Sequence, residues 1–234
     1  MKAFLLAAGF GTRLKPLTDE IPKCLIPIHN KPLLYYWLDL LEENGIDEVL
    51  INTHYFPEKI DESVHKRKNT IKITIYFEKE LLGTAGTIFT NRDFVKNEQD
   101  FFILYSDNLT NVSLTDLYLF HKSVDSLYTT YVYETKIPQQ KGIFLIDEST
   151  GKVFEFEEKP AVPKSNLANA GIGVLNKKIF DYFYSTNQDF SKEILPKIID
   201  KIYVLRTKRY IRDIGTIEDY NIAQKEWTNF QINI

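Results

Sequence analysis

A short apolar segment runs directly into a loop of glycine and basic residues at the N-terminus, and this junction constrains the fold most. Residues 2–7 are apolar without alternation, which predicts a buried strand, and Gly9, Gly11 and Arg13 follow them. Glycine lets backbone N–H groups approach phosphate oxygens closely, and a guanidinium can make bidentate phosphate contacts. Lys23 can place a second positive charge on a phosphate. Because open α/β sheets bind ligands where such strands end, the junction predicts a triphosphate site.

Other glycine loops fit this sequence poorly. The chain has no G-x-x-x-x-G-K-[ST] run, which excludes a P-loop. The dinucleotide fingerprint G-x-G-x-x-G fails because Leu14 stands where the third glycine belongs. The next strand ends near Asn52 and Thr53 without the acidic residue that would bind a ribose, which disfavours an NAD-type oxidoreductase. Gly9 and Gly11 alone would suit an ordinary tight turn equally well, but Arg13 and Lys23 favour phosphate binding.

The composition indicates a globular protein without a nucleic-acid partner. A chain of 234 residues with 44% hydrophobic and 26% charged residues suits one α/β domain. A formal charge of −3 provides no field for a nucleic-acid backbone. The single cysteine, Cys24, excludes an internal disulfide and is expected to be a small buried side chain. No apolar stretch approaches the roughly twenty residues of a membrane span, and the short N-terminal run is not a signal peptide. We expect a cytoplasmic protein with no membrane partner.

The first half of the chain alternates between strand and helix patterns. Helices are predicted from Pro32 to Gly45, from Pro57 to about Lys68, from Thr84 to Asn91, and after a capping box formed by Ser113 and Asp116; strands are predicted at 48–52, 71–77 and 101–105. This order predicts an α/β fold, with a Rossmann-like, doubly wound, mostly parallel mixed sheet covered by helices on both faces.

The second half differs, because several strand patterns follow one another directly. Segments 127–134, 142–147 and 152–158 predict a small antiparallel insertion. A strand at 168–175, helices near 176–184 and 190–200, two short strands around Arg206, and a final helix capped by Thr216 and Asp219 are predicted after it. We expect one domain over 1–234, with a nucleotide-binding half at 1–125 and a sugar-phosphate-binding half at 126–234.

Six motifs, in order along nearly the whole chain, carry a resemblance to a known family. They are Leu6 to Thr18 with Pro22-Lys23, Leu82-Gly83-Thr84-Ala85-Gly86, Tyr105-Ser106-Asp107, Glu157-Glu158-Lys159-Pro160, Asn169-Ala170-Gly171, and Asp213-Ile214-Gly215-Thr216. Together they resemble the sugar-1-phosphate nucleotidyltransferases, also called nucleoside-diphosphate-sugar pyrophosphorylases. Residues 82–86 are more like the mannose- and heptose-type guanylyltransferases than the thymidylyltransferases. The chain stops soon after its last predicted helix, so we expect it to lack the C-terminal β-helix domain of some relatives.

The resemblance implies a role for each matching residue. Catalytic roles fall to Arg13, Lys23 and Asp107; nucleotide binding to Leu6, Ala8, Gly9, Gly11, Thr12, Arg13, Lys23, Gly83 and Thr84; sugar-phosphate binding to Gly142, Glu158, Lys159 and Asn169; and Mg²⁺ binding to Asp107 and Asp213. Considered without the family, Asp213 and Asn108 would suit turns, and Lys159 would suit an exposed surface position. Asp107 is a stronger candidate, because it follows an apolar strand.

The resemblance implies metal-dependent transfer of a nucleotidyl group from an NTP to a sugar 1-phosphate, in the nucleotide-diphospho-sugar transferase fold. GTP is favoured; a UTP- or CTP-dependent transferase for another phosphorylated acceptor and a catalytically silent nucleotide-sugar-binding subunit are the alternatives. Loss of Arg13, Lys23 or a metal aspartate would mark a silent relative, and all are present. The partners are an NTP and a sugar 1-phosphate, with a homo-oligomer left open. Lys141 and Arg212 stand where an aromatic residue is frequent, which suggests an unusually anionic acceptor.

Overall fold

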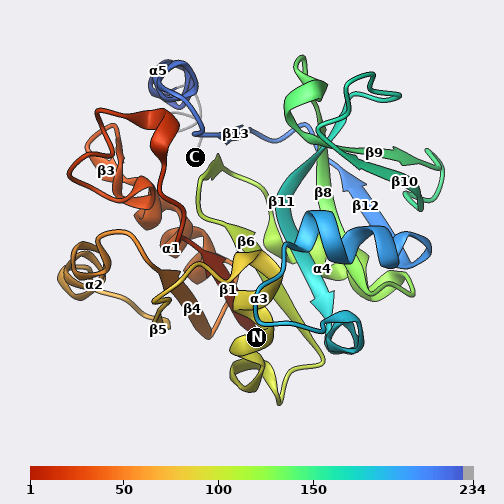
Figure 1. Ribbon diagram of the computed structural model, residues 1–234, viewed down its shortest axis with the longest axis horizontal. Helices are drawn as coiled ribbons and strands as arrows, with labels where there is room; N and C mark the ends of the chain where they lie inside the picture. Colours follow the sequence, from red (N-terminus) through yellow and green to blue (C-terminus); the bar gives the residue numbers. More distant parts are fainter. Residues whose placement is uncertain (229–234) are drawn as a thin grey trace. The chain divides into compact units, whose positions relative to one another are not determined.

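The computed structural model describes residues 1–228, and Figure 1 shows its helices and strands. The strands are β1 (Lys2–Leu6), β2 (Pro27–Ile28), β3 (Lys31–Pro32), β4 (Glu48–Thr53), β5 (Lys72–Phe77), β6 (Asp100–Tyr105), β7 (Asn108–Thr110), β8 (Tyr128–Glu134), β9 (Gly142–Ile146), β10 (Val153–Glu158), β11 (Leu167–Asn176), β12 (Ile202–Arg206) and β13 (Ile211–Asp213). The α-helices are α1 (Leu33–Glu43), α2 (Pro57–Lys66), α3 (Gly83–Thr90), α4 (Leu114–Ser123) and α5 (Ile217–Glu226).

Two compact units make up the chain, and each combines segments that are distant in sequence. Unit 1 contains Met1–Phe4, Leu81–Leu104 and Ser113–Lys208. Unit 2 contains Leu5–Glu80, Tyr105–Val112 and the segment that begins at Arg209. The predicted division into 1–125 and 126–234 concerns which substrate each half binds, and it stays a prediction.

Unit 1 is built around the long strand β11. Strands β6, β8 and β9 pair antiparallel with β11, β10 pairs antiparallel with β9, and β12 pairs parallel with β8. Most residues of β11 are buried, as expected for an apolar strand covered on both faces. Strands β9 and β10 pair antiparallel as predicted, whereas β8, the third segment of the predicted insertion, pairs with β11 and β12 instead. Helix α4 begins at its predicted cap, where the Ser113 hydroxyl accepts a hydrogen bond from the Asp116 backbone N–H.

Unit 2 places the N-terminal loop and the C-terminal helix against one hydrophobic core. Strands β4 and β5 pair in parallel and are connected by helix α2. Helix α1 begins after Pro32, as predicted, and packs a buried apolar stripe inward. Leu14, Leu109 and Ile214 share their core with Trp227, which follows α5. The segments that carry Arg13, Asp107 and Asp213 are therefore fixed to the same cluster of apolar side chains.

Two of the predicted helices are not α-helices but 3₁₀ and π structures. Residues 177–182 form a 3₁₀ helix, and Phe190–Ile194 form a π turn that is followed by short 3₁₀ turns. Pro196 lies in the first of these 3₁₀ turns, where its missing N–H prevents a continuous α-helix. The short strands β2, β3 and β7 were not predicted, because two or three residues show no periodicity.

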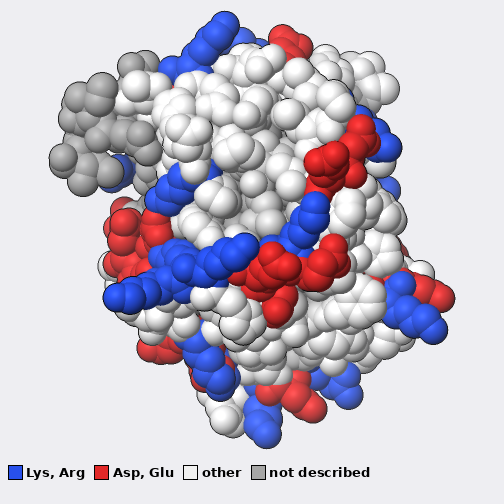
Figure 2. Space-filling model, turned by 90° about the vertical axis from the view of Figure 1, so that its left-hand side faces the viewer, with Lys and Arg blue, Asp and Glu red and all other residues white. Residues whose placement is uncertain are grey.

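Charged side chains of both signs lie on the surface of the described residues. On the face in Figure 2, lysine and arginine side chains lie next to aspartate and glutamate side chains in a band across the middle. Helix α2 in unit 2 contributes ion pairs of this kind, such as that between Lys66 and Glu62. No helix within residues 1–228 has the length and apolar character that crossing a bilayer requires.

Candidate active site

The glycine loop after β1 is held in a conformation that requires glycine at one position. Gly11 has a φ of 65°, in the left-handed region, and its carbonyl oxygen accepts hydrogen bonds from the Leu14 N–H and the Thr18 hydroxyl, both at 2.9 Å. A Cβ atom added to Gly11 would lie only 2.9 Å from the Thr18 methyl carbon. A Cβ on Gly9 would meet nothing within 4 Å, so the backbone at Gly9 borders open space. A ligand can therefore approach the chain at Gly9 without obstruction.

The other predicted loop residues lie along the same stretch of unit 2. The Leu6 carbonyl oxygen accepts a hydrogen bond from the Ser106 N–H at 3.1 Å, which fixes the end of β1. Ser106 is buried and makes this contact through its backbone N–H. In the family that the sequence resembles, a glycine is frequent at this position. Ala8 is buried, whereas Thr12 and Arg13 are exposed. The structure thus buries the strand end and presents the hydroxyl and the guanidinium to solvent.

Lys23 brings together the two aspartates that were predicted to bind metal. Its Nζ donates a hydrogen bond to Asp107 Oδ2 at 2.7 Å and lies 3.6 Å from Asp213 Oδ1. Asp107 occupies the turn between β6 and β7, and Asp213 ends β13. Strands β7 and β13 pair antiparallel with Asp213 opposite Asn108, so the ladder places the two carboxylates side by side. Asn108 is therefore a strand residue and not the turn former that its type suggested.

The Arg13 guanidinium lies near the Asp213 carboxylate because Gly215, next to both, has no side chain. A Cβ atom built on Gly215 would lie 3.2 Å from Arg13 Nη2 and 3.2 Å from Asp213 Oδ1. The missing side chain at Gly215 thus leaves room for the guanidinium beside the carboxylate. Arg13, Lys23, Asp107 and Asp213 accordingly lie in one site of unit 2. Gly215 was not assigned a role from the sequence, although it lies inside the last of the six motifs.

Three residues predicted to bind the sugar phosphate are neighbours in unit 1. Gly142 on β9 lies opposite Glu158 on β10, and a Cβ on Gly142 would come within 2.8 Å of Glu158 Oε2. Lys159 Nζ lies 3.8 Å from Glu158 Oε1. Burial raises the pKa of Glu158, and the positive charge of Lys159 opposes that shift. Lys159 has a φ of 52°, an uncommon conformation for a residue with a side chain and one that often marks a functional position.

The fourth of these residues, Asn169, is oriented by its neighbours on β8 and β11. Asn169 Oδ1 accepts a hydrogen bond from the Gly171 N–H at 3.1 Å and lies 3.0 Å from the Thr130 hydroxyl, which shares its one proton between Asn169 and the Ile172 carbonyl oxygen at 2.9 Å. The register between β11 and β8 shifts at this point, which indicates a bulge, a feature common beside active sites. Tyr128 packs its ring against Gly173, where no side chain would fit. Thr130 was not predicted, because nothing local distinguishes it from Thr129, the other threonine of β8.

Gly83 and Thr84 make contacts inside unit 1. Gly83 has a φ of 73°, and a Cβ there would lie 2.4 Å from the Gln188 carbonyl oxygen. The Thr84 hydroxyl accepts a hydrogen bond from the Phe190 N–H at 2.8 Å. These contacts join the start of α3 to the π turn. They give both residues a structural role, and the predicted contact with a nucleotide stays a prediction.

Arg212 is neutralised by acidic side chains of unit 2. Its guanidinium lies 3.0 Å from Glu226 and 3.4 Å from Asp219, and its Nε donates to the Tyr210 hydroxyl at 3.2 Å. A cation that is already paired twice adds little attraction for an anionic acceptor. The structure therefore gives no support to Arg212 as a determinant of acceptor charge.

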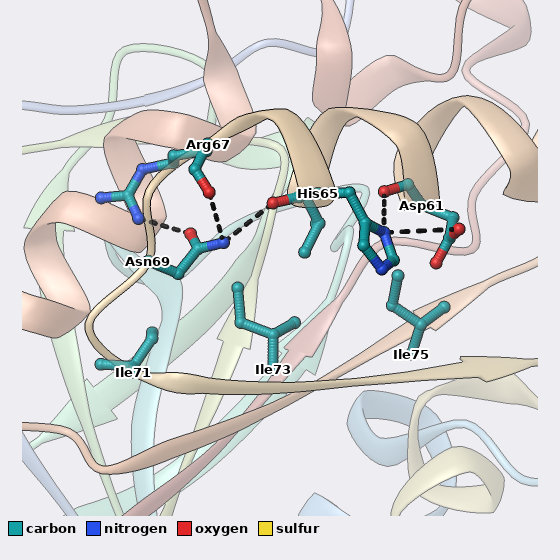
Figure 3. Close-up of a pocket in the computed structure, with 8 residues that line it drawn as sticks. Asp61, His65, Arg67, Asn69, Ile71, Ile73 and Ile75 are labelled. Carbon is teal, nitrogen blue, oxygen red and sulfur yellow. Dashed lines mark hydrogen bonds and ion pairs between the residues drawn. The ribbon is translucent and has the colours of Figure 1, made fainter.

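A separate groove of about 550 Å³ lies between α2 and β5 in unit 2. Figure 3 shows Ile73 and Ile75 pointing from β5 toward the helix, with Ile71 just before the strand and polar side chains along the rim. Arg67 at this rim is bound by Asp39 at 2.5 Å and by Glu42 at 2.6 Å. The arginine at this rim is therefore already paired, and the groove is not the candidate active site.

Cys24 is placed next to Lys23 but points into the protein interior. The side chain is 1% exposed, and burial raises the pKa of its thiol to about 12. We expect the folded protein to remain unmodified by a disulfide reagent at mildly alkaline pH, because neither access nor thiolate is available. Reaction of one thiol per chain should appear only in denaturing urea. Rapid modification of the folded protein would contradict this expectation.

The match to a family description covers almost the entire chain. The nucleotidyl transferase family model matches residues 2–229. The chain belongs to this family. Mannose-1-phosphate guanylyltransferase 1 of Arabidopsis thaliana is 36% identical over 226 residues, which cover 94% of this chain and 63% of the relative. The catalytic subunit beta of mannose-1-phosphate guanylyltransferase from Dictyostelium discoideum is 32% identical over 224 residues, which cover 94% and 62%. The chain thus spans less than two thirds of these curated relatives.

A solved structure shares the fold over nearly the whole chain. HddC from Yersinia pseudotuberculosis superposes with a TM-score of 0.82 at 28% identity, covering 97% of this chain and 99% of that chain. A second structure of HddC, complexed with GMP-PN, superposes with a TM-score of 0.81 at 29% identity, covering 97% and 99%. These comparisons confirm the predicted Rossmann-like nucleotidyltransferase fold.

Proposed function

We propose that this protein transfers a nucleotidyl group from an NTP, with GTP favoured, to a sugar 1-phosphate, releasing pyrophosphate. The observation that carries the proposal is the cluster of Arg13, Lys23, Asp107 and Asp213 beside the glycine loop. The relatives named as mannose-1-phosphate guanylyltransferases, and HddC complexed with GMP-PN, support a guanine nucleotide and a sugar phosphate. In the reaction, a phosphate oxygen of the acceptor bonds to the α-phosphorus of the NTP, and the bond from that phosphorus to the pyrophosphate leaving group breaks.

The residues of unit 2 supply positioning and charge. The open backbone at Gly9, with Gly11 and Thr12, gives N–H groups access to phosphate oxygens, as the exposed loop allows. Arg13 and Lys23 offset the charge that accumulates when two anionic reactants meet. Since phosphoryl-type transfer requires little covalent participation by the protein, these electrostatic contacts account for most of the expected rate enhancement.

Asp107 and Asp213 fit a Mg²⁺ ion. Both carboxylates converge on one ammonium group, so they face a point where a cation is stabilised. Within residues 1–228 no group of three or more histidine, cysteine or acidic side chains could hold a metal, and Mg²⁺ characteristically uses one or two carboxylates with waters and phosphate oxygens. Bound there, Mg²⁺ would neutralise charge on the NTP phosphates.

The residues of unit 1 suit the acceptor. Lys159 offers an ammonium for the phosphate of a sugar 1-phosphate, and its side chain is 63% exposed beside Glu158. Glu158 and Asn169 can hydrogen-bond hydroxyl groups of the sugar, and the absence of a side chain at Gly142 leaves room for the Glu158 carboxylate. These assignments follow from the resemblance, and the neighbouring positions of Gly142, Glu158 and Lys159 support them.

The proposal is tested by a substrate panel. Four NTPs are each combined with several neutral and acidic sugar 1-phosphates in the presence of Mg²⁺, and pyrophosphate release is measured. We expect the largest kcat/KM for GTP and a neutral hexose or heptose 1-phosphate, and no release when Mg²⁺ is chelated. Nucleotide-sugar binding without pyrophosphate release in any combination would instead indicate the silent binding subunit.

Removal of the Thr130 hydroxyl is expected to weaken acceptor recognition. Thr130→Val removes the hydroxyl that contacts both Asn169 Oδ1 and the Ile172 carbonyl oxygen, so the Asn169 amide is less firmly oriented, and we expect the KM for the sugar 1-phosphate to rise about tenfold. The KM for the NTP should change less than about twofold. The matched control is Thr129→Val on the same strand, because the Thr129 hydroxyl contacts His121 and Ser126 instead. Thr130→Ser should restore the wild-type KM; no change in Thr130→Val would contradict the assignment.

A further inference from the structure

A buried polar pair lies at the carboxyl ends of β4 and β5, and none of the roles described above uses it. Asn52 is 5% exposed and Glu78 is 2% exposed. Asn52 lies on β4, and Glu78 directly follows β5. The Glu78 N–H donates to the Thr53 carbonyl oxygen at 2.8 Å, which extends the parallel ladder by one residue. Ligands of open α/β sheets bind at this edge, so a buried carboxylate here requires a physical explanation.

The Asn52 carboxamide connects this pair to the start of the glycine loop. Its Oδ1 accepts a hydrogen bond from the Ala7 backbone N–H at 2.7 Å, and its Nδ2 donates to Glu78 Oε1 at 2.8 Å. A backbone N–H can only donate, so Oδ1 must face Ala7 and Nδ2 must face the carboxylate. Ala7 is the first residue after β1. The pair therefore fixes the backbone at the point where the strand becomes the loop.

A second contact leads from Glu78 to the tip of the same loop. His54 Nδ1 lies 2.8 Å from the Glu78 carbonyl oxygen, which can only accept, so the ring donates from Nδ1. The Phe10 ring, between the two glycines, packs edge-on against the His54 ring with centroids 5.1 Å apart. Tyr55 adds a further edge contact to Phe10 at 5.8 Å. Glu78 is thereby linked to both ends of residues 7–10.

We propose that Asn52 and Glu78 are positioning residues that set the direction of the glycine-loop backbone before the nucleotide binds. A buried carboxylate is costly unless it is hydrogen-bonded, and here its bond to Asn52 is aimed at the loop. Pre-organised backbone donors bind an anion without the entropic cost of ordering. The affinity for the NTP therefore depends on this pair, whereas the affinity for the acceptor does not. The inference rests on the proposed nucleotide site.

The test exchanges donor and acceptor within the pair. Asn52→Asp retains an acceptor for Ala7 but turns a second oxygen toward Glu78, so two acids face each other and can keep a hydrogen bond only by taking up a proton. We expect the KM for the NTP to rise about tenfold or more, in line with the cost of a buried unsatisfied group, and the KM for the sugar 1-phosphate to stay within about twofold. Adding Glu78→Gln supplies an amide donor to the carboxylate introduced at position 52, and the double variant should return to within about threefold of the wild-type value.

Asn69→Asp is the matched control, because it makes the same chemical change in the same unit at the opposite end of β5. Asn69 caps the end of α2 by donating to the Val64 and Arg67 carbonyl oxygens, and Figure 3 shows its contact with Arg67. Its NTP and acceptor KM values should match those of the wild type. Hydrogen exchange at the Ala7 amide, measured without substrates, should quicken in Asn52→Asp and slow again in the double variant.

The experiments distinguish a failure of this inference from a failure of the proposed function. A wild-type protein that releases no pyrophosphate refutes the function, and the exchange and NTP-binding measurements still test the pair. An unchanged NTP KM in folded Asn52→Asp, an equal rise in both KM values, or no recovery in the double variant would overturn the inference. Should Asn52→Asp fail to fold, Glu78→Ala removes the acceptor without adding a charge, and its NTP KM decides in the same way.

Discussion

Lys23→Ala is expected to lower the kcat for nucleotidyl transfer by about a hundredfold or more. Only 14% of the Lys23 side chain is exposed, and its ammonium lies within 3.6 Å of both Asp107 and Asp213. Its removal leaves two carboxylates facing the phosphates with one fewer cation to offset them. Electrostatic groups that meet charge developing in the transition state commonly contribute about this much. The measurement is pyrophosphate release with both substrates saturating.

The control for this variant is Lys15→Ala, in the same segment of unit 2. Lys15 is 59% exposed and pairs at the surface with Asp19, so its loss should change kcat less than about twofold. Circular dichroism and the melting temperature show whether both variants are folded. A folded Lys23→Ala protein that keeps more than a tenth of the wild-type kcat would remove Lys23 from the proposed mechanism.

Asp100→Ala is expected to cause the largest loss of stability, about 3–5 kcal/mol in the free energy of unfolding. The side chain is 2% exposed, and its oxygens contact the Lys122 ammonium at 2.9 Å, the Asn176 amide at 2.9 Å and His121 Nε2 at 3.3 Å. Alanine leaves the buried His121 ring and the half-buried Asn176 amide without this acceptor. Urea unfolding measures the change, and the exposed Asp181→Ala variant should differ from the wild type by less than about 0.5 kcal/mol.

The low pKa of Asp100 predicts that the protein loses part of its folding stability at acid pH. Burial alone would raise the pKa of Asp100, but hydrogen bonds from His121 and Lys122 hold it at about 2, below its ordinary value of 3.8. Because the folded pKa is the lower one, this contribution is complete above about pH 4 and is lost as the pH falls toward 2. Asp100→Asn should therefore lose less stability than the wild type across this interval. Parallel acid curves for the two proteins would count against the assignment.

Local features of the fold were predictable wherever neighbouring residues decide them. The caps at Ser113 and Thr216 formed as expected, since each hydroxyl accepts from a backbone N–H three residues later. Helix α1 begins after Pro32 because proline suits a helix start. Helices were predicted near 176–184 and 190–200, but their 3₁₀ and π types were not. The type of helix depends on packing and on Pro196, which local patterns do not show.

Some residues of the candidate site can be recognised from their neighbours in sequence, and others only from contacts between distant segments. Gly11 and Arg13 could be chosen as candidates from the sequence, because the requirement for small and basic residues in a phosphate loop is local. Asn52 and Glu78 were missed, since neither carries a local pattern and their bond depends on the pairing of β4 with β5. The signal that could have found them is their position at the ends of two neighbouring predicted strands.

By itself, the sequence determined which chemical groups are present: glycines that admit a ligand, two cations near the N-terminus, and acids that follow short strands. Only the tertiary structure decided that Asp213 stands beside Asp107, because the three-residue pairing of β13 with β7 joins segments with no periodicity of their own. The shared core of Leu14, Leu109 and Ile214 keeps those segments together. Contacts between distant segments depend on how the whole chain buries its apolar surface, and no local window of residues contains that information.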